Sequence, residues 1–94
     1  MSKQIRVLIS GRVQGVWYRR WTVNTASALG LSGWVRNLAS GQVEAVFCGE
    51  DDIVDQMLLA CQTGPELAHV TAIVTEPDSS QLSADKTFSK LEDG

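Results

Sequence analysis

Apolar residues recur at every second position near the start of the chain. Ile5, Val7 and Ile9 share one side of an extended segment, and Ser10-Gly11 follows them directly. A period of two is typical of a β-strand with one buried face. The pattern therefore predicts a first strand that ends at Ser10-Gly11.

A helical spacing follows after a loop that contains glycine. Between about Trp17 and Gly30, residues that would share one face of a helix recur at intervals of three or four. The residues on this face are Tyr18, Thr22, Ala26 and Leu29. Glycine commonly ends a helix in a left-handed cap. We expect a helix that begins close to Arg19 and ends at Gly30.

Two more strands are expected on either side of a hairpin connection. The connection is Asn-Leu-Ala-Ser-Gly at residues 37–41, and its glycine is available for a positive φ. The first strand is marked by Trp34, Val35 and Leu38, and one face of the second by Val43, Ala45 and Phe47. This alternation is typical of half-buried strands.

A second helix and two short strands complete the pattern. Acidic residues 50–52 place negative charge at the start of the helix, and Gly64-Pro65 stops it. Its apolar face contains Ile53, Val54, Met57, Leu58 and Cys61. Alternation over residues 70–74 predicts a fourth strand. Polar residues 77–85 predict a loop, and residues 87–91 are expected to form a short closing strand.

The order of these elements predicts an α+β fold of the ferredoxin-like type. Its sheet is mostly antiparallel, both helices lie on one face, and a short strand closes the C-terminus. A chain of 94 residues with 44% hydrophobic content suffices for one compact domain over residues 1–94. No apolar run approaches the roughly 20 residues that span a bilayer, and the first residues include no apolar stretch of the length typical of a secretory signal. We expect a cytoplasmic protein without membrane contact.

Charge is distributed unevenly along the chain. Residues 1–43 contain six basic side chains and no acidic one, whereas the remainder contains all eleven acids and two lysines, for a net charge of −3. This asymmetry indicates a local anion site, because a nucleic-acid footprint usually accompanies a basic domain. The alternative is that the two halves interleave in the fold and cancel.

Cysteine and histidine offer little chemistry. Cys48 and Cys61 form no Cys-x-x-Cys pair and are too few for a disulfide framework, so reduced, buried thiols are expected. His69 is the only histidine, has no clustered ligands, and is expected at the surface. We expect neither a metal nor a cofactor.

The loop before the first helix has the composition of a phosphate site. Residues 11–20 read Gly-Arg-Val-Gln-Gly-Val-Trp-Tyr-Arg-Arg. Glycine lets amides turn inward, a helix start adds partial positive charge, and arginine supplies a planar fork of donors. Taken alone, the two glycines also fit a plain turn, and no Gly-Lys-Ser/Thr follows as in a nucleotide-binding loop. Arg19 opposes the helix dipole, which an intervening anion would explain.

Two segments together resemble the signatures of the acylphosphatases. They are Gly11 through Arg19 and Gly33-Trp34-Val35-Arg36-Asn37, followed at fixed spacings by Gly41, Val43 and Gly49. The motifs span about half of the chain, and the element order covers nearly all of it. The resemblance implies a small metal-free enzyme that hydrolyses the carboxyl-phosphate bond of acyl phosphates to a carboxylate and inorganic phosphate. We expect a monomer that binds acyl phosphates and phosphate or sulfate anions, and no nucleic acid.

The resemblance also implies roles for individual residues. Arg19 would bind the phosphoryl oxygens, and Asn37 would hold the attacking water in line with the scissile bond. The backbone amides that cradle the phosphoryl group would be those of Gln14, Gly15, Val16, Trp17 and Tyr18. On spacing alone, an asparagine before a hairpin glycine is also a common turn former.

The loop departs from the family pattern at two positions. Tyr18 stands where phenylalanine is typical, and we expect it to pack beneath the helix with its hydroxyl bonded. Trp17 stands where the family has a smaller residue. It either walls the mouth of the site, favouring aromatic or extended acyl groups, or covers the sheet edge. Arg20 points about 100° away from Arg19 on a helix, so we expect it to be solvated.

A non-catalytic binding module is the competing interpretation. An RNA-recognition sheet should present aromatics among basic residues on its middle strands. The predicted third strand, Gln-Val-Glu-Ala-Val-Phe-Cys, offers one aromatic and an acid, and Trp21 and Trp34 are expected to pack. An anion sensor, or the acylphosphatase-like module of larger maturation enzymes, is a third possibility; the chain length argues against the latter.

Overall fold

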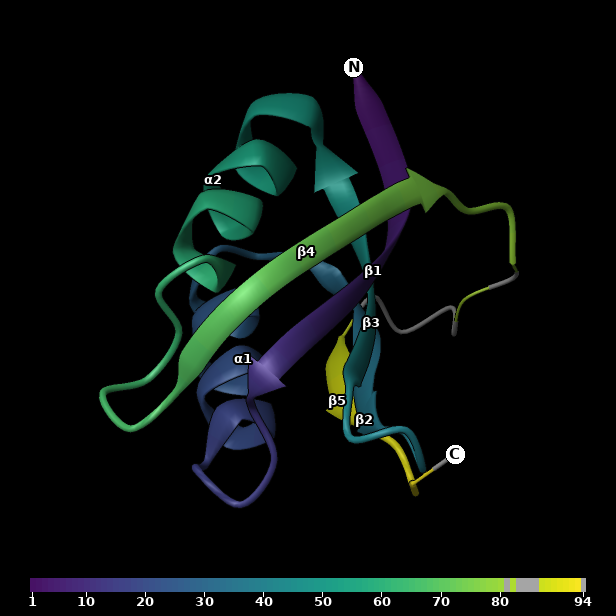
Figure 1. The fold of residues 1–94 in the computed structure, drawn as a ribbon. Helices are drawn as coiled ribbons and strands as arrows, with labels where there is room; N and C mark the ends of the chain where they lie inside the picture. The colour runs from purple at the N-terminus through teal and green to yellow at the C-terminus, as the bar shows by residue number, and fades with distance from the viewer. Residues whose placement is uncertain (81, 83–86, 94) are drawn as a thin grey trace.

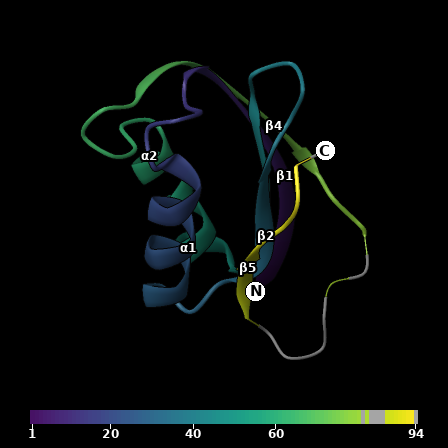
Figure 2. The ribbon, with the colours of Figure 1, turned by 90° about the horizontal axis from the view of Figure 1, so that it is seen from below.

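Two helices cover one face of a five-stranded sheet in the computed structural model, which describes residues 1–80, 82 and 87–93 (Figure 1). The elements in chain order are β1 (Ser2–Arg12), α1 (Tyr18–Ala28), β2 (Ser32–Asn37), β3 (Val43–Glu50), α2 (Asp51–Cys61), β4 (His69–Pro77) and β5 (Phe88–Lys90). Viewed from below, the helices form one layer and the sheet the other (Figure 2). The predicted ferredoxin-like order is confirmed. Most of the predicted loop over residues 77–85 lies outside the described residues or in β4.

The sheet places strands beside partners that are not their neighbours in sequence. Its order is β4-β1-β3-β2-β5, so β1 pairs with both β3 and β4. All pairings are antiparallel except that of β5, which runs parallel to β2 with Lys90 opposite Val35. The mostly antiparallel sheet is therefore confirmed, and its parallel edge is the closing strand.

β1 continues past Ser10 and Gly11, where the sequence pattern predicts its end. The register with β4 shifts between these two residues, which marks a β-bulge, and pairing goes on to Arg12 opposite His69. Gly11 has φ 119°, and a Cβ there would lie 2.1 Å from the His69 carbonyl oxygen. Glycine thus bends this strand and does not end it. His69 itself is exposed, as expected.

The core fills the space between the sheet and the two helices. Every second residue of the central strands enters it, and the rings of Phe47 and Phe88 stack there at 5.4 Å. The fully enclosed members from the strands and α2 are Val7, Ile9, Val35, Val43, Ala45, Phe47, Val54, Met57 and Cys61. The C-terminal residues of β1, β2 and β5 lie at the same end of the sheet, next to the site described below.

Tyr18, the first residue of α1, joins the two helices. Its side chain is buried against Trp21 and its hydroxyl donates a hydrogen bond of 2.7 Å to the carbonyl of Cys61, the last residue of α2. Carbonyls in the last turn of a helix have no partner within the helix, so this bond satisfies one of them. The expected partner for the hydroxyl is confirmed. Burial raises the pKa of Tyr18 and raises the pKa of Cys61 to about 12.

Removing this hydroxyl is expected to lower the stability of the fold. Tyr18→Phe leaves the Cys61 carbonyl buried without its donor, which costs about 1–2 kcal/mol in the free energy of unfolding. Urea unfolding at pH 7 measures the loss. Between pH 9 and 11 the wild type also loses stability, because the unfolded chain releases protons that buried Tyr18 and Cys61 retain. The variant should lose less per pH unit; equal slopes would contradict this account.

Both thiols are free, but they differ in exposure. Cys61 is buried and Cys48 is half-buried, so the expectation of two buried thiols is wrong for Cys48. Cys48 alternates with the enclosed residues of β3 and therefore lies on the face of the sheet away from the helices. Within the described residues, no helix is long and apolar enough to cross a membrane, and no three acidic, histidine or cysteine side chains form a metal cluster.

Candidate active site

The loop between β1 and α1 presents unpaired amides on an inward curve. Gly15 and Trp17 adopt φ 73° and 68°. Left-handed residues in a loop turn successive amides toward a common point and create an anion-binding concavity. Within the described chain, the amides of residues 14–18 donate no hydrogen bond to another group. The sequence pattern of this loop thus produces a set of free donors.

The start of α1 adds to this positive character. Trp17 occupies the N-cap position without a side-chain cap hydrogen bond, and no acid lies in the first turn. The first turn of α2, in contrast, contains Asp51 and Asp52. An uncapped helix start leaves its amides and the partial positive charge of the dipole available to an external anion.

Trp17 is the one described non-glycine residue with positive φ. A bulky residue in this region costs about 1–2 kcal/mol, and such strain is concentrated at functional sites. Its side chain is 69% exposed and lines the pocket described below. Of the two interpretations open from the sequence, the structure favours the wall of the site over a cover for the sheet edge.

Arg19 lies in the first turn of α1 and faces the same pocket. Its side chain is 31% exposed, and Nη1 donates to Oδ1 of Asp93 in the C-terminal tail at 2.9 Å. The partner carboxylate is 62% exposed, so this ion pair is weak and open to exchange. A carboxylate resting on the guanidinium marks the position that an anionic ligand would take.

Asn37 is the last residue of β2 and enters the pocket from the sheet. The expected hairpin begins one residue later, with Leu38 N–H bonded to the Gln42 carbonyl at 2.9 Å, so Asn37 is not a turn residue. Only 8% of Asn37 is exposed, and its Oδ1 is buried without a hydrogen-bond partner in the described chain. Buried polar atoms are almost always paired, so this oxygen marks a site for a further donor.

Gln14 ties the loop to the hairpin that follows Asn37. Its Nε2 donates to the carbonyls of Leu38 and Gln42 at 2.8 and 2.9 Å. Val16 instead packs into the core at 6% exposure. Neither side chain lines the pocket, so both would act there through their backbone amides alone.

One pocket of about 520 Å³ brings most of the predicted residues together. From the predicted set, its lining contains Gly15, Trp17, Tyr18, Arg19 and Asn37. The lining residues that the sequence reasoning did not place in the site are Val13, Arg20, Val23, Asn24 and Lys90. Arg20 is exposed, as expected, yet it also faces this pocket.

Lys90 and Asp93 reach the site because β5 lies beside β2. Period-two alternation from buried Phe88 puts Lys90 on the helix-facing side of the sheet. The alternation that predicts which side of the sheet Lys90 faces is present in the sequence. The parallel pairing with β2 that brings Lys90 to the pocket is not.

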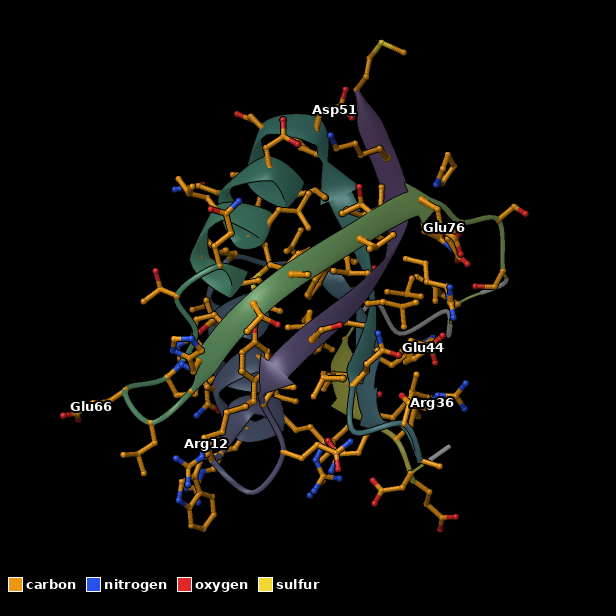
Figure 3. The ribbon with its side chains drawn as sticks, in the orientation of Figure 1. Arg12, Arg36, Glu44, Asp51, Glu66 and Glu76 are labelled. Carbon is orange, nitrogen blue, oxygen red and sulfur yellow. The ribbon has the colours of Figure 1, made fainter. Side chains whose placement is uncertain are left out.

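The basic first half of the chain is largely neutralised by the acidic second half. Glu44, 3% exposed on the face away from the helices, accepts from Nε of both Arg6 and Arg36 at 2.5 and 2.6 Å. Figure 3 labels Glu44 and Arg36 on this part of the sheet. Arg6 also pairs with Glu76, and the bonds to Glu44 and Glu76 raise the pKa of Arg6. Interleaving of the two halves therefore explains these cations, whereas Arg19 and Arg20 lie at the pocket.

Removing the tail carboxylate is expected to strengthen anion binding modestly. Asp93→Asn frees Arg19 from a contact that an anion must displace, so the inhibition constant of inorganic phosphate should fall two- to fivefold. The difference should shrink at 1 M salt, where exposed charges are screened. Competition kinetics at two salt concentrations measure both effects. A weaker affinity in the variant would mean that Asp93 positions Arg19 for the anion.

Comparisons with known proteins relate the chain to a family. The family model described as Acylphosphatase matches residues 5–89. An acylphosphatase of Rhodopseudomonas palustris is 57% identical over 77 residues, covering 81% of this chain and 78% of that one. The structure of an acylphosphatase from Coxiella burnetii matches with TM-score 0.88 and 34% identity over 96% of this chain and 93% of that one. The crystal structure of acylphosphatase from Bacillus subtilis matches with TM-score 0.86 and 32% identity, covering 97% of this chain and 99% of that one.

Proposed function

Because the chain belongs to the acylphosphatase family, we propose that Arg19 and the amides of residues 14–18 bind the phosphoryl group of an acyl phosphate, while Asn37 orients the attacking water. The family comprises hydrolases that act on phosphorus-containing acid anhydrides. The reaction breaks the carboxyl-phosphate bond and yields a carboxylate and inorganic phosphate.

The observation that carries this proposal is the unpartnered Oδ1 of Asn37. It is buried at the pocket that Arg19 also lines, and it accepts no hydrogen bond from the described chain. A buried acceptor without a donor costs about 1–3 kcal/mol, and a substrate water would supply that donor. The second proton of this water then faces away from Asn37, and a lone pair on the oxygen of the water is left free to attack phosphorus.

The proposed reaction needs no further catalytic side chain from the protein. Phosphoryl transfer depends mainly on positioning and on stabilising the charge of the equatorial oxygens, which loop amides and a guanidinium fork both provide. A carboxylate is a good leaving group, so a general acid is dispensable. Asn37 is neutral and a poor base; we propose that a phosphoryl oxygen of the substrate takes the proton of the water.

The outer face of the sheet supports an enzyme over an RNA-binding module. Trp34 lies there with the Arg36 guanidinium 5.2 Å from its ring centroid, and Arg36 is paired with buried Glu44. An RNA platform needs aromatic rings free to stack on bases and cations free for phosphates. A single-domain monomer in the cytoplasm, able to bind phosphate or sulfate, stays a prediction for this chain.

Hydrolysis of benzoyl phosphate in the presence of a chelator tests the proposed function. We expect turnover that is unaffected by the chelator and is inhibited competitively by inorganic phosphate, because product and substrate share the loop and Arg19. Absence of turnover, with phosphate still bound, would overturn the enzymatic assignment and favour an anion-binding module.

A further inference from the structure

Three cationic side chains surround the pocket from two sides. Arg19 and Arg20 come from the first turn of α1, and Lys90 comes from the end of β5. None of the described residues that line the pocket is an aspartate or a glutamate, and the nearby Asp93 pairs with Arg19 alone. A concave site lined by one sign of charge concentrates ligands of the opposite sign.

Arg20 and Lys90 differ from most basic side chains of this protein because no described carboxylate pairs with them. The basic residues that do form ion pairs are Lys3, Arg6, Arg19 and Arg36. The protein as a whole is acidic, with a net charge of −3. Two unpaired cations at one pocket of an acidic protein therefore create a local positive potential that is not used within the described fold.

Binding of the phosphoryl group alone does not account for these two cations. In the proposed function that group occupies the loop amides and Arg19, which already supply charge and donors. Neighbouring helical residues do not face each other, so Arg20 diverges from the guanidinium of Arg19. The pocket of about 520 Å³ has room for more than a phosphoryl group, and Trp17 and Val23 add apolar walls. The acyl group of the substrate is the part left to meet Arg20 and Lys90.

We propose that this pocket selects acyl phosphates whose acyl group carries a second negative charge, and that Arg20 and Lys90 bind that charge. The inference rests on the proposed function, since it takes the phosphoryl end at Arg19 as its starting point. Both side chains are exposed, so each contact with a carboxylate should change the selectivity by about two- to fivefold.

A pair of rigid substrates isolates this charge. 4-Carboxybenzoyl phosphate and 4-methylbenzoyl phosphate have the same ring and the same scissile bond, and the para carboxylate cannot reach the acyl phosphate of its own molecule. The ratio of their kcat/KM values, corrected for uncatalysed hydrolysis, should exceed one in the wild type and fall toward one as salt screens the exposed charges. Inhibition by benzylphosphonates with the same para groups gives the corresponding binding ratio.

Methionine variants assign the selectivity to residues. Lys90→Met and Arg20→Met keep a long unbranched stem and remove the charge, so each should lower the ratio two- to fivefold, and the double variant about tenfold. Lys3→Met is the matched control, because it removes the same charge from the far end of β1, where Lys3 pairs with Asp55. The control should keep the wild-type ratio.

The outcomes separate this inference from the proposed function. Turnover of 4-methylbenzoyl phosphate with an unchanged ratio in Lys90→Met and Arg20→Met overturns the inference alone. An equal loss on both substrates also overturns it, since the cations would then act on the phosphoryl group. If neither substrate turns over in the wild type, the proposed function itself fails.

Discussion

Replacing Arg19 by glutamine is expected to lower kcat/KM for benzoyl phosphate by about a thousandfold and to weaken inorganic phosphate binding as well. The Arg19 side chain lines the pocket beside the loop amides, where it would meet the phosphoryl oxygens both in the bound substrate and in the transition state. Loss of one such donor commonly costs a factor of 10² to 10³, and loss of a positioned arginine in phosphoryl transfer more. Steady-state kinetics with phosphate as inhibitor measure both effects.

Two further variants give this result its meaning. Arg19→Lys keeps the charge without the planar fork, so it should recover phosphate binding better than turnover. Arg12→Gln removes an arginine from the end of β1 that leads into the loop before α1 (Figure 3). Arg12 does not line the pocket, so this variant should keep near wild-type kinetics. The Arg19–Asp93 pair is exposed, so stability should hardly change. Near wild-type turnover in Arg19→Gln would contradict the assigned role.

Asn37→Ala is expected to separate turnover from binding. Its amide would contact the attacking water and not the phosphoryl group, so kcat should fall about 10²- to 10³-fold while the inhibition constant of phosphate changes less than about threefold. Comparison with Arg19→Gln distinguishes the two roles, because that variant should lose both turnover and phosphate binding. A parallel rise in the phosphate inhibition constant would assign Asn37 to anion binding.

Stability provides the control for Asn37. Its Oδ1 has no partner in the described chain, so truncation breaks no hydrogen bond at that atom. We therefore expect the free energy of unfolding in urea to stay within about 1 kcal/mol of the wild type. A loss of several kcal/mol would attribute the kinetic defect to damage of the fold at the end of β2.

Local patterns predicted most of the fold because they report on burial. Alternation over the strands and three-to-four spacing over the helices identify which side chains enter the core. These patterns predict both helix starts within about a residue, whereas the observed helices end at Ala28 and Cys61, short of the predicted stops at Gly30 and Gly64. The sequence pattern predicts a strand end at Gly11 where the structure has a bulge, since a glycine that bends a strand and one that ends it look alike in sequence. Only the close approach of the His69 carbonyl distinguishes them.

The site was predictable where it lies within one segment. Arg19 and the loop follow from glycine spacing and a helix start, and resemblance to a family linked them to Asn37. Lys90 at the pocket and Asp93 beside Arg19 were missed because a parallel pairing between β2 and β5 brings this part of the chain there. Such pairings depend on how distant strands order themselves in the sheet, and no local pattern encodes that order.

The two hydrogen bonds from Gln14 tie the loop between β1 and α1 to the turn between β2 and β3, so the two segments should move together. Anything that shifts the carbonyls of Leu38 or Gln42 is transmitted to the loop amides, although neither carbonyl would touch the substrate. Lengthening this turn by one residue should therefore misalign the loop with Asn37, whereas an insertion in the loop after α2 should be tolerated. We therefore expect the length of this surface turn to influence the catalytic rate.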